Sequence, residues 1–288
     1  MIGSEELPAD KRAAYHLARA EAFRADRDKE QAEAEFHAAI ALHEDLVEAY
    51  IGLSELRLPG EGYKWWLRRF HEALQPRTYL EIGVEDGHTL SLANPPTRAI
   101  GIDPQPRSMP LFRAETQIFP ETSDAFFADG HARSSLGAHP VDSAFIDGEH
   151  VFAQSLRDFI NVEAYCGERS LILLHDTIPL DEITQRPERQ RTFYTGDVWK
   201  TVLCLKHYRP DLDIFTIATP WSGLTIVAGA DRNSNVLAGC YNEAVAKFET
   251  VDYRDLQGRE KQMLNVVPND WEVVAERLER RKIVSSNQ

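Results

Sequence analysis

Four side chains that can bind a metal ion or move a proton lie at the ends of two short apolar runs. Asp147 and His150 follow the run VDSAFI, and His175 and Asp176 end the run SLILLHD. When such runs form neighbouring strands of a parallel sheet, their carboxyl ends meet at one edge, where these folds bind ligands. Two carboxylates and an imidazole there are suitable ligands for Mg²⁺, Mn²⁺ or a similar divalent ion. We therefore predict a metal site at Asp147, His175 and Asp176.

His150 has two interpretations. An imidazole has an unperturbed pKa of about 6.5, so it can accept a proton near neutral pH. In this interpretation His150 and Asp147 are the catalytic residues. Alternatively, His150 caps the helix after its strand and orients the intervening loop.

A glycine turn lies earlier in the chain, in the stretch TYLEIGVEDGHT. Gly83 and Gly87 have no Cβ, so the backbone can turn tightly there and approach a ligand. The dinucleotide fingerprint G-x-G-x-x-G is incomplete because Glu85 stands at its middle glycine. Carboxylates at Glu81 and Glu85 disfavour a phosphate group and favour a cationic ligand. A nicotinamide-dependent oxidoreductase is therefore the weaker alternative.

The elements that would position these residues are short apolar runs separated by longer polar segments. TYLEIG, TRAIGID, DAFFAD, VDSAFID and SLILLHD are interpreted as five buried strands of a parallel sheet, with helical crossovers between them. Two further β-rich runs, 214–218 and 224–228, flank the turn TPWSG and predict a hairpin. The expected fold is α/β: a Rossmann-like, doubly wound, mostly parallel seven-stranded sheet that ends in an antiparallel hairpin.

Helical patterns flank this core on both sides and predict three regions. Residues 1–72 form a helical arm, 73–232 the core, and 233–288 a C-terminal helical extension. Part of the arm, EAEFHAAIALHEDLVEAYIGLSEL, resembles a tetratricopeptide repeat, but it covers little more than one repeat, and a solenoid needs about three. We interpret the arm as a cap or a homodimer contact, with a protein-binding platform as the alternative.

The motifs of the core resemble class I S-adenosylmethionine-dependent methyltransferases. LEIGVEDGHT resembles their first motif, AIGIDPQP places Asp103 at the end of the second strand, and FFADGHA places Asp129 at the end of the third. FIDGEHVFAQSLRDF, SLILLHDT and GDVWK resemble the D-G-x-H and H-D branch of small-molecule O-methyltransferases. The pattern departs at YCGERSLI, where Glu168 replaces a usual second glycine.

The resemblance implies a role for each motif residue. The methionine end of S-adenosylmethionine would lie at Glu81, Gly83 and Gly87, its ribose at Asp103, and its adenine at Asp129 and Gly130. Metal-dependent relatives carry ligands at strand ends that match Asp147, His175 and Asp176, although His175 stands where they usually have an acid. In those relatives a basic residue at the position of His150 takes the proton of the acceptor.

The resemblance further implies methyl transfer to the oxygen of a small molecule, such as a sugar or natural-product hydroxyl. Residues 179–200 are a candidate acceptor lid, with Arg186, Arg189 and Arg191 facing an acidic group; a solvated charged loop is the alternative. The rival function from another class is a non-catalytic, methyltransferase-like interaction protein with a helical partner-binding arm.

The amino-acid composition limits which classes of partner the protein can bind and where in the cell it is expected. The chain has 288 residues and a formal net charge of -14, which disfavours binding to nucleic acid or to anionic membranes. Its three cysteines lack zinc spacing and form no disulfide framework. We see no apolar run of about 18 residues and no secretory signal pattern. The expected location is the cytoplasm.

Overall fold

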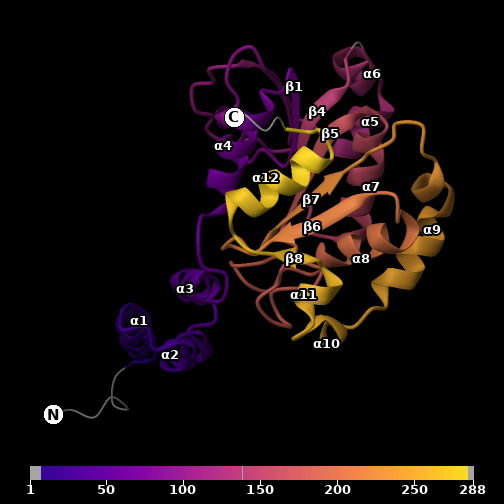
Figure 1. Cartoon of the computed structure of the whole chain (residues 1–288). Helices are drawn as coiled ribbons and strands as arrows, with labels where there is room; N and C mark the ends of the chain where they lie inside the picture. The colour runs from indigo at the N-terminus through magenta and orange to yellow at the C-terminus, as the bar shows by residue number, and fades with distance from the viewer. Residues whose placement is uncertain (1–7, 138, 285–288) are drawn as a thin grey trace.

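The computed structural model describes residues 8–137 and 139–284, and an eight-stranded sheet lies at its centre (Figure 1). The strand order is β3-β2-β1-β4-β5-β7-β6-β8. The strands are β1 (Thr78–Ile82), β2 (Arg98–Ile102), β3 (Glu115–Phe119), β4 (Val141–Ile146), β5 (Cys166–His175), β6 (Asp213–Ile217), β7 (Leu224–Ala228) and β8 (Val266–Val267). Strands β1 to β5 pair in parallel, and β7 lies antiparallel between β5 and β6. The predicted α/β fold with a terminal hairpin is therefore confirmed.

Two details differ from the prediction. The sheet has an eighth strand, because β8 from the C-terminal extension pairs with β6. The run DAFFAD is not the third strand but helix α5 (Ser123–Ala128), whose first turn is capped by the Thr122 side chain accepting from the Ala125 amide. The true third strand, β3, lies at the sheet edge and is half exposed, so it shows no continuous apolar run.

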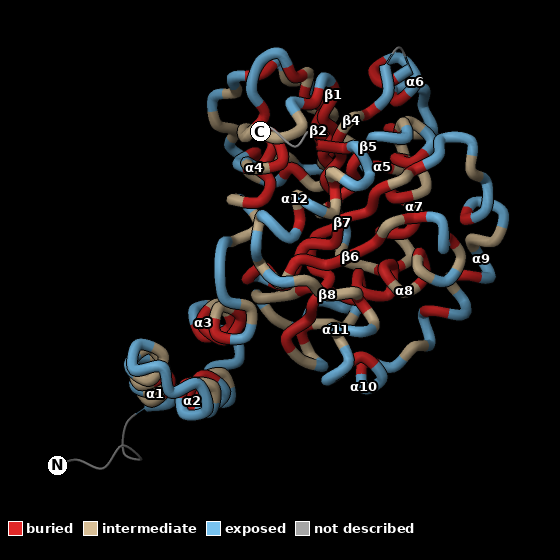
Figure 2. The backbone as a smooth tube through the Cα atoms, in the orientation of Figure 1, coloured by how far each residue is buried: buried red, intermediate tan, exposed pale blue. Residues whose placement is uncertain are grey.

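Helices cover both faces of the sheet, because its strands direct alternate side chains to opposite sides. Leu80 packs on one face with helices α5, α6 (His131–Leu136), α7 (Phe152–Glu163), α8 (Trp199–Tyr208) and α9 (Val236–Glu249). Tyr79 packs on the other face with α4 (Tyr63–Leu74), the short η2 (Leu90–Leu92) and α12 (Trp271–Arg280). Figure 2 shows the resulting buried strands at the centre of the molecule.

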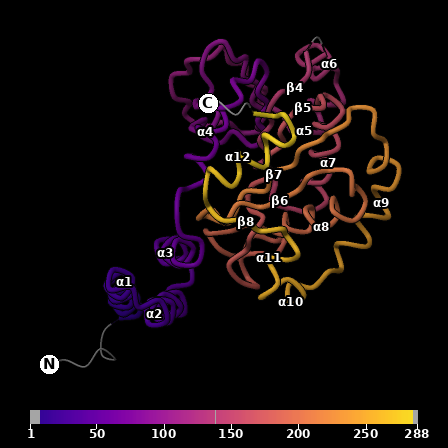
Figure 3. The backbone as a smooth tube through the Cα atoms, viewed as in Figure 1, coloured from indigo at the N-terminus to yellow at the C-terminus, as the bar shows by residue number. Residues whose placement is uncertain are grey.

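The C-terminal segment returns to the beginning of the core, where α12 lies beside α4 (Figure 3). It arrives through the short helices α10 (Tyr253–Leu256) and α11 (Glu260–Met263) and then β8. The Trp66 and Trp271 rings lie 5.9 Å apart, and the Trp66 indole donates to Asn269 Oδ1 at 2.7 Å. These contacts close one face of the sheet with residues about 200 positions apart in the sequence.

The N-terminal arm consists of α1 (Ala9–Ala25), α2 (Lys29–Leu42) and α3 (Val47–Arg57), which project to one side of the sheet (Figure 1). It has a small apolar core of its own, centred on Phe36. Gly52 fits against this ring, since a Cβ there would lie 2.4 Å from it. Its likeness to a tetratricopeptide repeat and the three-region division remain predictions. Within 8–137 and 139–284, no helix combines the length and apolarity needed to cross a membrane.

Candidate active site

A cavity of about 820 Å³ opens at the carboxyl edge of the sheet. Four neighbouring parallel strands, β1, β2, β4 and β5, end in it and contribute Ile82, Gly83, Ile102, Asp103, Asp147 and His175. This is the edge at which open parallel sheets bind their ligands. The sequence prediction that the strand ends would meet here is confirmed for these four strands.

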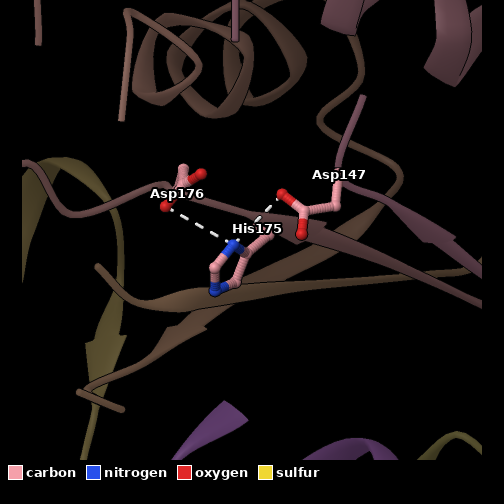
Figure 4. Close-up of side chains that lie close together, drawn as sticks. All are labelled: Asp147, His175 and Asp176. Carbon is pink, nitrogen blue, oxygen red and sulfur yellow. Dashed lines mark hydrogen bonds and ion pairs between the residues drawn. The ribbon is translucent and has the colours of Figure 1, made fainter. Parts of the chain in front are cut away.

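Asp147, His175 and Asp176 form a compact cluster in this cavity (Figure 4). His175 Nδ1 lies 3.2 Å from Asp147 Oδ1 and 3.4 Å from Asp176 Oδ1. One ligand atom from each residue lies within 4.8 Å of the others. Among the described residues, the buried Nε2 of His175 has no hydrogen-bond partner, and the ring packs on Tyr63 with 4.2 Å between ring centroids. The donor set suits a divalent ion of intermediate hardness.

His150 extends the cluster. Its Nδ1 lies 3.2 Å from Asp176 Oδ2 and 3.2 Å from the Tyr194 carbonyl oxygen, and its Nε2 lies 3.5 Å from Asp147 Oδ1. The Tyr194 ring stacks on the imidazole, with 5.4 Å between centroids and 10° between planes. The structure thus brings Asp147, His150, His175 and Asp176 together.

Mutual charge dominates the cluster. Burial alone would lower the pKa of His175, but the carboxylates of Asp176 and Asp147 outweigh it and raise the pKa to about 10. The same balance raises the pKa of His150 to about 9. Burial would raise the pKa of Asp147, yet the two imidazoles hold it well below its usual range. Positive charge is therefore strongly favoured between these carboxylates, whether it comes from protons or from a cation.

Local backbone geometry holds the cluster in place. Gly83 has φ +86°, and a Cβ there would lie 1.9 Å from the Asp147 carbonyl oxygen, so only glycine allows β1 and β4 to end side by side. Asp176, Trp221 and Ser222 all have left-handed φ values of 57°, 62° and 85°. The Ser222 hydroxyl donates to Asp176 Oδ1. Such unfavourable conformations persist where surrounding contacts fix them, often at functional sites.

The residues predicted to bind a cofactor separate into two groups. Gly83 and Asp103 line the cavity, and Asp103 accepts from the backbone amides of Glu85 and Gln105 at 2.8 and 2.7 Å. Glu81 does not reach the cavity lining. It is fully buried and accepts from the Tyr79 and Thr89 hydroxyls, each at 2.7 Å.

Gly87, Asp129 and Gly130 are also absent from the residues that line the cavity. A Cβ at Gly87 would lie 2.6 Å from Met109 Sδ, so this glycine permits a close packing contact. The placement of Asp129 at the end of the third strand is wrong, because it is the C-terminal cap of α5 and Gly130 precedes α6. The segment after β3 reaches the cavity instead through Thr122, Ser123 and Asp124.

Several lining residues had no signal in the sequence. Gln154 and Asp158 come from α7, Trp221 and Ser222 from the turn between β6 and β7, and Val47 and Ile51 from α3 of the arm. The candidate lid does reach the cavity, through Arg189, Thr192, Phe193 and Tyr194. Of the other lid arginines, Arg186 lies 3.8 Å from Glu182, and Arg191 pairs with Glu44 at 2.9 Å.

Comparison with known protein families identifies the core. Residues 80–177 match the family model described as a methyltransferase domain. The matched segment runs from β1 to the residues just after β5 and contains the whole cluster of Asp147, His175 and Asp176. This match agrees with the methyltransferase resemblance of the sequence motifs. A comparison with curated protein sequences gives no match.

Solved structures with a similar arrangement include three with 12–17% identity. Cofactor-bound Rv0187 from MTB has 17% identity and a TM-score of 0.46, over 64% of this chain and 87% of its own. An O-methyltransferase from Bacillus cereus in complex with SAH has 12% identity and a TM-score of 0.44, and the match covers 59% of this chain and 84% of the other. The O-methyltransferase TomG from Streptomyces achromogenes in complex with SAM has 16% identity and a TM-score of 0.44, and the match covers 58% of this chain and 79% of the other.

Proposed function

We propose that this methyltransferase domain transfers the methyl group of S-adenosylmethionine to an oxygen of a small molecule, assisted by a divalent cation. The observation that carries the proposal is the cluster of Asp147, His175 and Asp176 beside His150. It lies in a cavity at the ligand-binding edge of a domain that matches a methyltransferase family. The juxtaposition provides a place for donor and acceptor and a group that can take the acceptor's proton.

Gly83 and Asp103 would hold the cofactor, with its ribose at the Asp103 carboxylate. Other acids line the same cavity, Glu85, Asp124 and Glu149 among them. This negative lining suits a cofactor with a sulfonium and an ammonium group and disfavours one with phosphates. Glu81 and Gly87 would act from behind the lining by fixing the glycine turn. Ser123 and Asp124 replace Asp129 and Gly130 in the proposed adenine side.

Asp147, His175 and Asp176 would hold the cation, because the partly buried Asp147 carboxylate, the buried Asp176 carboxylate and an imidazole nitrogen face one another there. The mixed oxygen and nitrogen set favours Mn²⁺, Fe²⁺ or Zn²⁺ over Mg²⁺. Such an ion, when bound, supplies positive charge that lowers the pKa of a coordinated hydroxyl. A cation between Asp147 and Asp176 would offset the negative charge that raises the pKa of His150. The neutral imidazole would then accept the hydroxyl proton at Nε2, while its Nδ1 is held by Asp176 and the Tyr194 carbonyl.

The acceptor in this proposal is a small molecule, in keeping with a cavity of about 820 Å³ and a net charge of -14. A homodimer contact through the helical arm and a cytoplasmic location stay predictions from the sequence.

Thermal unfolding of the purified chain tests the proposal. The chain is heated with S-adenosylmethionine, with S-adenosylhomocysteine and with NADH, each with and without EDTA. A ligand at a hundred times its Kd adds about 2.7 kcal/mol to the free energy of unfolding. We expect stabilisation by both adenosyl ligands and none by NADH. Absence of any shift with the adenosyl ligands would overturn the proposal and favour an interaction protein.

A further inference from the structure

We infer that helix α3 of the N-terminal arm forms a wall of the acceptor subsite, and that the acceptor carries a flat apolar body beside its reacting hydroxyl. The inference rests on the proposed function and specifies the substrate class of the same site. It assigns acceptor selection to a segment that lies outside the methyltransferase domain match, which begins at residue 80.

The cavity has two kinds of lining. The ends of β1 and β2 and the first turn of α5 contribute glycine and acids, namely Gly83, Asp103 and Asp124. Three other segments contribute apolar side chains: α3 provides Val47 and Ile51, the loop 179–198 provides Phe193, and the turn between β6 and β7 provides Trp221. The first lining suits the charged cofactor, and the second suits an apolar body.

The apolar lining is continuous with the reacting groups. Tyr194, next to Phe193, stacks on the His150 imidazole. Ser222, next to Trp221, donates to the Asp176 carboxylate. A molecule that contacts Phe193 and Trp221 is therefore adjacent to the groups that would direct its hydroxyl.

Helix α3 is fixed to the loop by specific contacts. The Asp45 carboxylate, just before α3, accepts from the Thr192 amide at 2.8 Å. The buried Tyr50 ring stacks on Phe193, with 5.4 Å between centroids and 8° between planes. The arm therefore holds Phe193, the loop residue that contributes to the apolar lining.

A second set of contacts fixes α3 to the hairpin turn. The Ser54 hydroxyl is fully buried and accepts from the Trp221 amide at 2.9 Å. Trp221 is nevertheless 39% exposed, one of the few large apolar side chains with so much accessible surface. An exposed indole held by buried contacts at the edge of a cavity is a contact surface for a ligand.

The chemistry of these side chains selects the acceptor class. Val47, Ile51 and Phe193 offer no hydrogen bonds, so a polar polyol would lose its hydration against them without compensation. An aromatic or otherwise flat hydrocarbon body gains from leaving water there and from stacking on aromatic rings.

Binding measurements on variants of the full chain test the inference. The probes are 2-naphthol, a hydroxyl on a flat apolar body, and methyl glucoside, which carries hydroxyls on a polar body. Both are titrated calorimetrically in the presence of saturating S-adenosylhomocysteine and Mn²⁺. The variants are Ile51→Ala, which removes part of the wall, and Ile51→Trp, which fills the cavity. Leu46→Ala is the matched control, because Leu46 packs in the core of the arm and is not among the cavity-lining residues.

We expect 2-naphthol to bind more tightly than methyl glucoside. Both Ile51 variants should raise the Kd of 2-naphthol at least about tenfold, because one loses an apolar contact and the other blocks the pocket. Leu46→Ala should change the Kd of 2-naphthol less than twofold. The Kd of S-adenosylhomocysteine should be the same in all variants. Tighter binding of methyl glucoside, or equal 2-naphthol affinity in the Ile51 variants, would overturn the inference. Failure of S-adenosylhomocysteine to bind the unmodified chain would instead overturn the proposed function.

Discussion

Gly196 lies directly against the backbone of His150. A Cβ at Gly196 would lie 1.7 Å from the His150 carbonyl oxygen, and the glycine has φ +60°. Tyr194, two residues earlier, stacks on the His150 ring. The loop 179–198 therefore fixes the position of both the backbone and the side chain of His150, although 46 positions separate His150 from Gly196.

The first prediction concerns this contact. Gly196→Ala should lower kcat at least tenfold and leave the affinity for S-adenosylmethionine unchanged, because the added methyl group displaces His150 and not the cofactor half of the cavity. Gly258→Ala is the control, since Gly258 has a similar φ of +75°, but a Cβ there would meet no atom of the described residues within 4 Å apart from its chain neighbours. The control should lose about 1–2 kcal/mol of stability from backbone strain alone and keep its kcat. Equal kcat in the two variants would contradict the positioning role.

The second prediction concerns the cofactor. Asp103→Asn should weaken S-adenosylmethionine binding more than tenfold, because an amide both loses the negative charge and presents an N–H group toward the amides of Glu85 or Gln105. Asp142→Asn is the matched control: Asp142 accepts from the amides of Arg77 and Thr78, at the opposite edge of the sheet. Calorimetric titration measures the affinity of both variants for S-adenosylmethionine. Unchanged affinity in Asp103→Asn would remove Asp103 from the site.

The third prediction concerns the metal. Asp147→Asn should abolish tight Mn²⁺ binding, measured by calorimetry, and with it metal-dependent turnover, while sparing cofactor binding. Asp158→Asn removes another acid from the cavity lining, one that accepts from Ser123 at 2.6 Å, and should leave Mn²⁺ binding unchanged. Dialysis against EDTA should reproduce the Asp147→Asn phenotype in the unmodified chain. Full EDTA-resistant activity would reject the metal role.

The fourth prediction concerns pH and Glu81. Complete burial of its carboxyl group raises its pKa from 4.5 to about 8, against the opposing effect of the Thr89 and Tyr79 hydrogen bonds. Between these two values the folded chain holds a proton that the unfolded chain has released, so the free energy of unfolding must fall as pH rises from about 4.5 to about 8. The fall due to this group is on the order of 4 kcal/mol.

Glu81→Gln should flatten this part of the profile, because an amide does not ionise. Urea unfolding at pH 5, 6, 7 and 8 measures the effect. Glu48→Gln is the control, since Glu48 is exposed and its replacement should leave the slope of the unmodified chain intact. An equally steep fall in Glu81→Gln would show that other groups cause the dependence.

The sequence by itself was sufficient to predict which side chains meet at the ends of β4 and β5. An apolar run followed by Asp147, or ending in His175 and Asp176, is a local pattern, and the parallel arrangement brings its ends together without further information. The same holds for the glycine turn at Gly83 and for the terminal hairpin. The third strand was misassigned because DAFFAD and ETQIF are both short, and periodicity cannot separate a buried helix turn from a strand at that length.

Only the tertiary structure decided which distant segments complete the cavity. Val47 and Ile51 are ordinary helix residues in the sequence, and nothing local marks them as cavity lining. They reach the site because Tyr50 stacks on Phe193 and Ser54 binds the Trp221 amide, contacts that span more than 140 positions. Local sequence fixes periodicity and chain breaks, whereas the meeting of remote surfaces depends on the packing of the whole chain. The acids and histidines at the ends of β4 and β5 were therefore predictable, and the walls around them were not.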